Sequence, residues 1–202
     1  MRIESLRREQ WPEAAHVLAR AFVTNPLHIA AFGPGEVAKS EAFFRLALNV
    51  MRGPMLVATG DSGVLGAIHW VDSPGCRYSR LEKLRMMPAM IRGLGLPSAL
   101  RLASWLSHWS RQDPAEPHSH LGPIGVSPDA QGRGVGQRLM ERYCAQLDRV
   151  GGVGYLETDR PENVPFYRRF GFETTEQDFV LGVPSYSMIR RRGTACAASA
   201  VS

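Results

Sequence analysis

The feature that most constrains this chain is a glycine-rich junction between an apolar segment and an amphipathic one. Residues 124–136 read Ile-Gly-Val-Ser-Pro-Asp-Ala-Gln-Gly-Arg-Gly-Val-Gly. Large apolar residues then recur every fourth position, at Val135, Leu139, Tyr143 and Leu147. This spacing is typical of one buried helix face, and Gly151-Gly152 is a suitable helix end. The pattern predicts a strand, a loop and a helix in direct succession.

The glycines of this junction predict an anion-binding loop. Gly132, Gly134 and Gly136 allow successive main-chain N–H groups to converge where a side chain would obstruct them. The helix that follows adds the positive end of its dipole, and Arg133 adds a charged donor. A purely structural role is less favoured, because glycine costs about 0.8–1 kcal/mol inside a helix. The expected ligand is a phosphate or a pyrophosphate.

Two common phosphate-binding motifs do not fit. The dinucleotide fingerprint G-x-G-x-x-G requires a glycine where this chain has Gln137. A P-loop requires Gly-Lys followed by Ser or Thr, and the sequence contains no Gly-Lys pair. The loop therefore belongs to another class of phosphate site.

The segment from Gln131 to Gly136 resembles the Q/R-x-x-G-x-G/A signature of the GNAT superfamily of N-acetyltransferases, including the apolar strand and Ser-Pro before it. Leu-Glu-Thr at 156–158 and the segment 163–172 resemble later parts of that fold, in particular of puromycin N-acetyltransferase-like members. The resemblance is specific over about 118–175, loose over 1–75 and absent over 77–112. It implies acetyl-CoA as the cosubstrate.

The resemblance implies an α/β (α+β) fold with a mixed, twisted, mostly antiparallel sheet of six to seven strands flanked by helices. The sheet is expected to splay between its fourth and fifth strands, with acetyl-CoA in the gap. Residues 77–112 read as a helical insertion between the third and fourth strands, with a second helix from Ser98. Residues 1–192 are expected to form one domain, and 193–202 a flexible tail.

Periodicity and breakers place the other elements. Asn25-Pro26 is expected to end the first helix, and Gly-Asp-Ser-Gly at 60–63 predicts a hairpin turn. The expected strands are 2–6, 55–59, 64–71, 118–126, 153–157, 172–181 and 185–190, and the expected helices are 9–23, 36–51, 134–150 and 161–170.

Pro123 lies inside the expected strand 118–126, so the strand must bulge or lose its partner there, since proline donates no hydrogen bond. In the family such a bulge frees main-chain groups for the pantetheine arm. The resemblance therefore assigns pantetheine contacts to Ile124 and Val126. It assigns pyrophosphate contacts to the main chain of Gln131, Gly132, Arg133, Gly134, Val135 and Gly136.

The implied reaction is direct acetyl transfer from a thioester to an amine. Tyr167 stands where the family motif carries its tyrosine, so the resemblance implies it as the acid for the departing thiolate, and a phenol is protonated at neutral pH and can donate. The alternative is core packing, since Phe166 and Phe170 already form an apolar pair. Asn163, one turn earlier, would bond the cofactor amides or simply begin the helix.

Glu157, at the end of a strand beside the expected gap, is the candidate base, acting directly or through water. The alternative is a solvated or ion-paired carboxylate. His118 and His120 point to one face of a strand, where they would act as a base or contact the substrate. No third metal ligand is evident beside them, so no metal is expected.

The acceptor is expected to be a small-molecule primary amine held by aromatic side chains. The candidate contacts are Phe22, Asn25, Trp105 and Trp109. The alternative for the tryptophans is an ordinary buried helix face. The chain is expected to be a monomer or a homodimer. A second hypothesis, from another class, is a non-catalytic CoA-binding sensor or scaffold.

Composition narrows the partners and the compartment. The net charge is +5, but only Lys39 and Lys83 of the 24 basic residues are lysines, and no basic run exceeds Arg190–Arg192, so nucleic acid is not expected. No apolar run approaches the ~20 residues of a membrane helix. Three distant cysteines, no Cys-x-x-Cys pair and no signal-peptide pattern favour a reducing, cytoplasmic setting.

Overall fold

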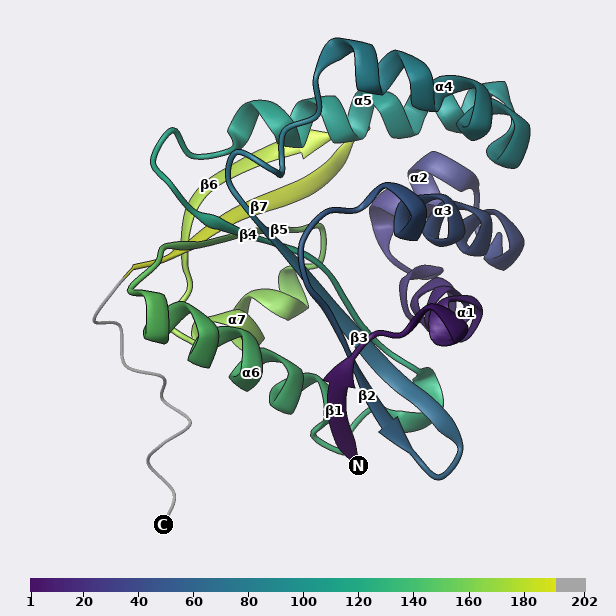
Figure 1. Cartoon of the computed structure of the whole chain (residues 1–202). Helices are drawn as coiled ribbons and strands as arrows, with labels where there is room; N and C mark the ends of the chain where they lie inside the picture. The colour runs from purple at the N-terminus through teal and green to yellow at the C-terminus, as the bar shows by residue number, and fades with distance from the viewer. Residues whose placement is uncertain (192–202) are drawn as a thin grey trace.

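A seven-stranded sheet with the strand order β1-β2-β3-β4-β5-β7-β6 organises the chain. The computed structural model describes residues 1–191 (Figure 1). Every neighbouring pair is antiparallel except β4 and β5, which are parallel. The strands are β1 (Arg2–Ser5), β2 (Met55–Gly60), β3 (Gly63–Asp72), β4 (Ser119–Val126), β5 (Gly154–Thr158), β6 (Glu173–Val180) and β7 (Val183–Arg190). The predicted mixed, mostly antiparallel sheet is confirmed.

Helices cover both faces of this sheet (Figure 1). The helices are α1 (Trp11–Phe22), α2 (Pro26–Phe32), α3 (Val37–Val50), α4 (Arg80–Leu94), α5 (Leu96–Gln112), α6 (Val135–Val150) and α7 (Val164–Arg168). Short 3-10 turns are η1 (Arg8–Gln10), η2 (Pro128–Ala130) and η3 (Pro161–Asn163). None of the helices in residues 1–191 has the length and apolar character needed to cross a membrane.

Alternation along the strands produces two core layers. In β3, Ala67 faces the layer formed with α1 and α3, whereas the next residue, Ile68, faces the layer formed with α6 and α7. Successive strand side chains point to opposite faces, so one strand serves both layers. The α6 face contributes the spaced apolar residues expected from the sequence, and Leu139 and Tyr143 have no exposed surface. This packing fixes the start of α6 against the sheet.

The sheet opens between β4 and β5. These strands pair only through Ser119↔Gly154 and His120↔Tyr155. On its other edge β4 has a bulge, because the pair Ile68↔Ile124 is followed by Trp70↔Leu121, so three steps of β4 oppose two of β3. Pro123 lies in that bulge, as predicted. Beyond His120, the edge of β4 that turns toward β5 has no strand partner among residues 1–191.

The helical insertion is present, with boundaries that differ from those expected. The second helix begins at Leu96 rather than Ser98, because the break is a single residue, Gly95, at φ +78°. Pro97 lies in the first turn of α5, where its missing N–H costs no hydrogen bond. Ser79 and Glu82 form a capping box that begins α4.

One helix was missed. The Asn25-Pro26 step ends α1 as expected, but it also begins α2, with Pro26 in the first turn. Proline is compatible with a helix start because its φ is already helical and its N–H is not needed there. The turn of Asp61 and Ser62 joins β2 to β3, so the predicted hairpin is confirmed. The predicted flexible tail from Gly193 lies outside the described residues.

Candidate active site

A large cavity follows the opening between β4 and β5. Its volume is about 1290 Å³, and it extends from the glycine-rich loop to the inner faces of α3 and α5. It gathers nearly every site residue predicted from the sequence, namely Phe22, Asn25, Trp105, Trp109, Ile124, Val126, Gln131, Gly132, Gly134, Val135, Gly136, Glu157, Asn163 and Tyr167. Arg133 does not line the cavity; its side chain is exposed.

The glycine-rich loop leaves its main chain open. Gly132 and Gly134 have φ values of +73° and +75°, a region that favours glycine, and nothing lies within 4 Å of the position of an added Cβ at either residue. Gly134 is the N-cap of α6, and the first helix bond runs from Arg138 N to Gly134 O at 3.1 Å. The preceding N–H groups of Val135, Gly136 and Gln137 therefore have no carbonyl within the helix.

Tyr167 packs in the core and also lines the cavity, and its role as an acid stays a prediction. Its ring packs against Phe166 and Phe172, with centroid distances of 5.4 and 6.3 Å. The residue also lines the cavity, and its hydroxyl makes no hydrogen bond within the described part of the chain. Burial, reinforced by the nearby charge of Asp159, raises the pKa of Tyr167 above its ordinary value. The phenol is therefore protonated at neutral pH.

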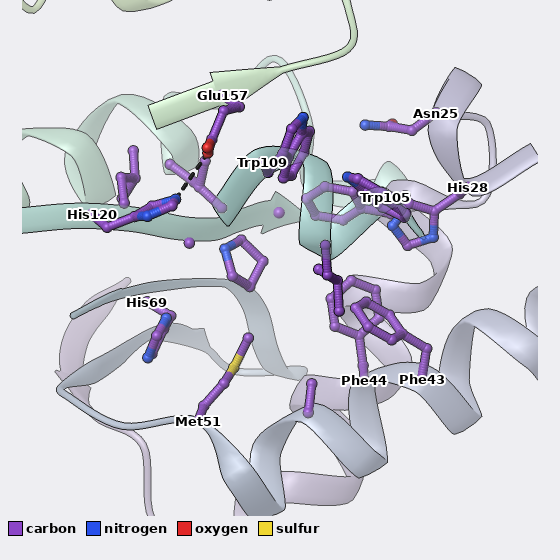
Figure 2. Close-up of a pocket in the computed structure, with 18 of the residues that line it drawn as sticks. Asn25, His28, Phe43, Phe44, Met51, His69, Trp105, Trp109, His120 and Glu157 are labelled. Carbon is purple, nitrogen blue, oxygen red and sulfur yellow. Dashed lines mark hydrogen bonds and ion pairs between the residues drawn. The ribbon is translucent and has the colours of Figure 1, made fainter. Parts of the chain in front are cut away.

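Glu157 is ion-paired. Its Oε2 atom lies 2.8 Å from Nε2 of His120, and its side chain is only 1% exposed (Figure 2). Burial lowers the pKa of His120, but the negative charge of Glu157 and the contact with Asp113 outweigh it and raise that pKa well above its ordinary value. The other oxygen, Oε1, is buried without a hydrogen-bond partner among residues 1–191. The role of Glu157 as a base stays a prediction.

Asp159, which sequence reasoning missed, fixes the turn between α1 and α2. Asn25 Nδ2 donates to Asp159 Oδ1 at 3.2 Å, and the main-chain N–H of Leu27 donates to Oδ2 at 2.8 Å. Asn25 is 6% exposed and is thus held by this carboxylate at the edge of the cavity. Asp159 follows β5 directly, so a polar residue at a strand end beside the gap was the available signal.

We expect Asp159 to make stability depend on pH. Burial raises its pKa above the ordinary 3.8, even though Leu27 and Asn25 donate to it. As pH rises, the Asp159 carboxyl therefore loses its proton in the unfolded chain at a lower pH than in the folded protein. The free energy of unfolding consequently falls as pH rises through the native pKa. Asp159→Asn removes that slope while an amide oxygen still accepts from Leu27.

Urea unfolding of both proteins between about pH 4 and pH 8 tests this expectation. The free energy of unfolding of Asp159→Asn, relative to that of the wild type, should increase as pH rises and then level off. Asp129→Asn, which alters a carboxylate that is 74% exposed, is the matched control. A difference for Asp159→Asn that does not vary with pH would contradict the assignment.

Aromatic rings form the far wall of the cavity, opposite the His120–Glu157 pair (Figure 2). His28 lies between α1, α3 and α5, and its ring centroid is 5.7 Å from that of Phe44 and 5.4 Å from that of Trp105. Burial lowers the pKa of His28 to about 3, so this ring is neutral at physiological pH. Sequence reasoning found Trp105 but missed His28, which lies on the unpredicted helix α2. It also missed Phe43 and Phe44, which read as ordinary helix-core residues.

The two tryptophans differ in their polar contacts. Their rings meet edge to face at 5.1 Å. Trp109 Nε1 donates to Ser185 Oγ at 2.9 Å, which ties α5 to β7. Trp105 Nε1 is buried and has no hydrogen-bond partner in the described part of the chain. An indole N–H is a donor only, so Trp105 offers one unused donor in an otherwise apolar wall.

Comparisons with known proteins agree with this architecture. Over 94 residues the chain is 38% identical to the N-alpha-acetyltransferase RimI of Mycobacterium tuberculosis, which covers 44% of this chain and 57% of that protein. Over 81 residues it is 36% identical to the mycothiol acetyltransferase of Saccharomonospora viridis, covering 35% of this chain and 26% of that protein. The chain thus spans about a quarter of the mycothiol acetyltransferases that it matches.

Solved structures share the whole fold at low sequence identity. A histone acetyltransferase HPA2-related protein from Corynebacterium glutamicum superimposes with a TM-score of 0.72 and 21% identity, covering 96% of this chain and 97% of that one. Arylalkylamine N-acetyltransferase 2 from Aedes aegypti gives 0.67 and 13%, covering 94% and 98%. The family model described as "Acetyltransferase (GNAT) family" matches residues 65–172. This match spans more than half of the chain and includes the glycine-rich loop and the strands at the opening of the sheet. The chain therefore belongs to the GNAT acetyltransferase family.

Proposed function

We propose that this protein transfers an acetyl group from acetyl-CoA to a primary amine of a small molecule, directly and with both substrates bound. The observation that carries the proposal is the continuity of the cavity. One volume of about 1290 Å³ joins the glycine-rich loop, the unpaired edge of β4 and the aromatic wall. Two reactants held in one cavity react as if at very high effective concentration, so no covalent enzyme intermediate is needed.

Acetyl-CoA fits the first two parts of this cavity. The open main chain at Gly132 and Gly134 and the free N–H groups at the start of α6 suit a pyrophosphate. The unpaired edge of β4 presents main-chain donors and acceptors near Ile124 and Val126 to an amide-containing arm. Asn163 lines the same region and offers a further amide. The cosubstrate would supply the activated thioester.

The proposed chemistry moves one acetyl group and two protons. The neutral amine attacks the thioester carbonyl, the C–N bond forms, and the C–S bond breaks. Tyr167 donates its phenolic proton to the departing sulfur, because it faces the cavity with a free, protonated hydroxyl. Glu157 accepts the proton that the amine loses, directly or through water. The geometry supports these roles by placing both side chains on one cavity.

The acceptor is proposed to be an amine with an aromatic or otherwise apolar body. The wall that would contact it consists of Phe22, His28, Phe43, Phe44, Trp105 and Trp109. The His28 imidazole is neutral because of its low pKa, so the aromatic wall itself is uncharged and suits an apolar body. The resemblance to puromycin N-acetyltransferase-like members stays a prediction, consistent with an amphipathic amine of this kind.

Coenzyme A release with a panel of amines tests the proposed function. The panel contains arylalkylamines, aliphatic amines, an aminoacyl nucleoside and a peptide with a free N-terminus. We expect the highest kcat/KM for amines with an aromatic body. Turnover of the peptide alone would overturn the small-molecule assignment. Binding of coenzyme A without turnover of any amine would instead favour the non-catalytic sensor.

Gly134→Val is expected to weaken coenzyme A binding by about tenfold or more. A branched residue at φ +75° costs about 1–2 kcal/mol of stability whether or not ligand is bound, but its methyl groups would also enter the open space above the loop, where the pyrophosphate is proposed to lie. A steric cost of about 1.4 kcal/mol in the bound state alone corresponds to a factor of ten in Kd. Calorimetric titration with coenzyme A measures this change.

Gly182→Val is the matched control, because Gly182 also has a positive φ, +79°, with nothing near an added Cβ, and it lies in the β6–β7 turn and does not line the cavity. It should lose comparable stability and keep the wild-type Kd. An equal loss of affinity in both variants would show that strain in the fold, rather than the cradle, weakens binding.

A further inference from the structure

Four side chains that are able to bind a metal ion meet where the helical insertion joins β4. Cys76 precedes α4, Asp113 follows α5 directly, and His118 and His120 lie at the start of β4. One donor atom from each residue lies within 4.8 Å of the donor atoms of all the others. The sequence revealed the two histidines only. The helical insertion separates Cys76 from the other three residues, and Asp113 reads as an ordinary loop residue.

The separations are close to those of a tetrahedral ion. Cys76 Sγ lies 3.8 Å from His118 Nε2, which lies 3.7 Å from Asp113 Oδ1. Asp113 Oδ1 lies 3.0 Å from His120 Nδ1. Zinc bonds of about 2.0–2.1 Å to nitrogen and about 2.3 Å to sulfur place tetrahedral ligand atoms roughly 3.3–3.6 Å apart. The set has to contract by roughly one ångström at its widest to surround such an ion.

Both histidines are held so that one nitrogen faces the cluster. His118 Nδ1 lies 2.9 Å from the main-chain oxygen of Glu116, which only accepts, so Nδ1 carries the proton and Nε2 faces the cluster. His120 Nε2 lies 2.8 Å from the carboxylate of Glu157, so its Nδ1 faces the cluster. Metal-binding histidines are commonly oriented in this way by a carbonyl or a carboxylate on the other ring nitrogen.

The atoms at the centre of the cluster are buried and unsatisfied. The side chains of His118 and Asp113 are 0% and 2% exposed. Asp113 Oδ1 and His120 Nδ1 face each other at 3.0 Å, yet neither makes a hydrogen bond of acceptable geometry within residues 1–191. The second oxygen of Asp113 lies 3.6 Å from Arg77 Nε, which leaves Oδ1 for the cluster. Buried polar atoms that meet only a poorly oriented ion-pair partner are uncommon, and a bound ion would satisfy both of them.

We propose that Cys76, Asp113, His118 and His120 form a zinc site that fastens both ends of the helical insertion to β4. A thiolate, two imidazoles and a carboxylate suit Zn²⁺, which is borderline-soft and takes four ligands. When the metal binds, the Cys76 thiol and the Nδ1 nitrogen of the His120 ring, which is held as a cation by Glu157, each give up a proton to solvent. Four protein ligands fill the coordination sphere, so the ion is structural. The proposal does not depend on the proposed acetyl transfer.

Metal titration of the chelator-treated protein, freed of any histidine tag, tests the site. We expect one Zn²⁺ per chain in competition with a chromophoric chelator. Co²⁺ in its place should give the intense visible bands of a tetrahedral ion and a thiolate charge-transfer band. Cys76→Ser should abolish the charge-transfer band and weaken Zn²⁺ binding by more than about tenfold. Cys144→Ala is the matched control, because Cys144 lies in the core away from the cluster.

Alkylation gives a second readout that does not require a ligand variant to fold. Zn²⁺ should protect Cys76, located by peptide mass mapping, from a thiol reagent, and it should raise the Tm of the wild type but not of Cys76→Ser. The proposal is overturned if the wild type binds no Zn²⁺ at micromolar concentration. It is equally overturned if Cys76→Ser, with a normal circular dichroism spectrum, binds Zn²⁺ as tightly as Cys144→Ala.

Discussion

Tyr167→Phe is expected to lower kcat by about 10²-fold and to leave the Kd of coenzyme A unchanged. The substitution removes only the hydroxyl, and the ring contacts with Phe166 and Phe172 persist. Without the phenolic proton, the departing thiolate leaves as an anion. The effect is expected near the lower end for acid catalysis, because a thiol with a pKa of about 8.5 is already a fair leaving group. Steady-state kinetics and calorimetry separate the two quantities.

Tyr186→Phe is the matched control, since Tyr186 lies on β7, packs against the same core and does not line the cavity. This variant should keep wild-type kcat. If Tyr167→Phe also keeps it, Tyr167 is a packing residue, and the alternative that the sequence left open is the correct one. A large loss of coenzyme A affinity would instead assign the hydroxyl to cofactor binding.

Arg190→Ala is expected to lower the free energy of unfolding by about 3 kcal/mol. Arg190 is 2% exposed and lies at the end of β7. Its guanidinium holds Asp148 through two bonds of 2.7 and 3.1 Å, and its Nε donates to the main-chain oxygen of Phe170 at 2.8 Å. Removing the Arg190 side chain leaves a gap in the packing and leaves the main-chain oxygen of Phe170 without this donor. Asp148 is 57% exposed, so water re-solvates that carboxylate and limits the loss.

Arg191→Ala provides the comparison on the adjacent residue. Arg191 pairs with Glu116 at 2.6 Å, but the two side chains are 58% and 42% exposed. Exposed pairs contribute about 0–1 kcal/mol, so this variant should unfold close to the wild type in urea. Equal losses in the two variants would show that the buried geometry of Arg190 has no special effect on stability.

Much of the sheet could be predicted, because its determinants are local. Pro123 removes a donor wherever it stands in a strand, and the bulge in β4 follows from that. The four-residue spacing that ends at Leu147 places α6 against the sheet before any tertiary contact is known. The helix α2 was missed because Pro26 is equally compatible with a loop and with a helix start.

The candidate site was less predictable where it depends on residues far apart in the sequence. Tyr167 and Gly134 stand in a recognisable motif, so their positions could be expected. Asp159 holds Leu27 across 132 residues, and no local pattern reveals that contact. Cys76 stands 42 residues before His118, and only the return of α5 to the start of β4 brings the two together. Long-range pairing of this kind is set by packing.

The two ends of the helical insertion lie together at its base. Arg77 Nη2 donates to the main-chain oxygens of Asp113 and Pro114, at 3.3 and 3.0 Å, so the chain departs from the sheet and returns to it at almost the same point. A segment with adjoining ends behaves as a cassette, which can be exchanged without altering the strand register on either side. Because Trp105 and Trp109 of this cassette belong to the proposed acceptor wall, we expect its exchange between relatives to change acceptor preference while the acetyl-CoA half is retained.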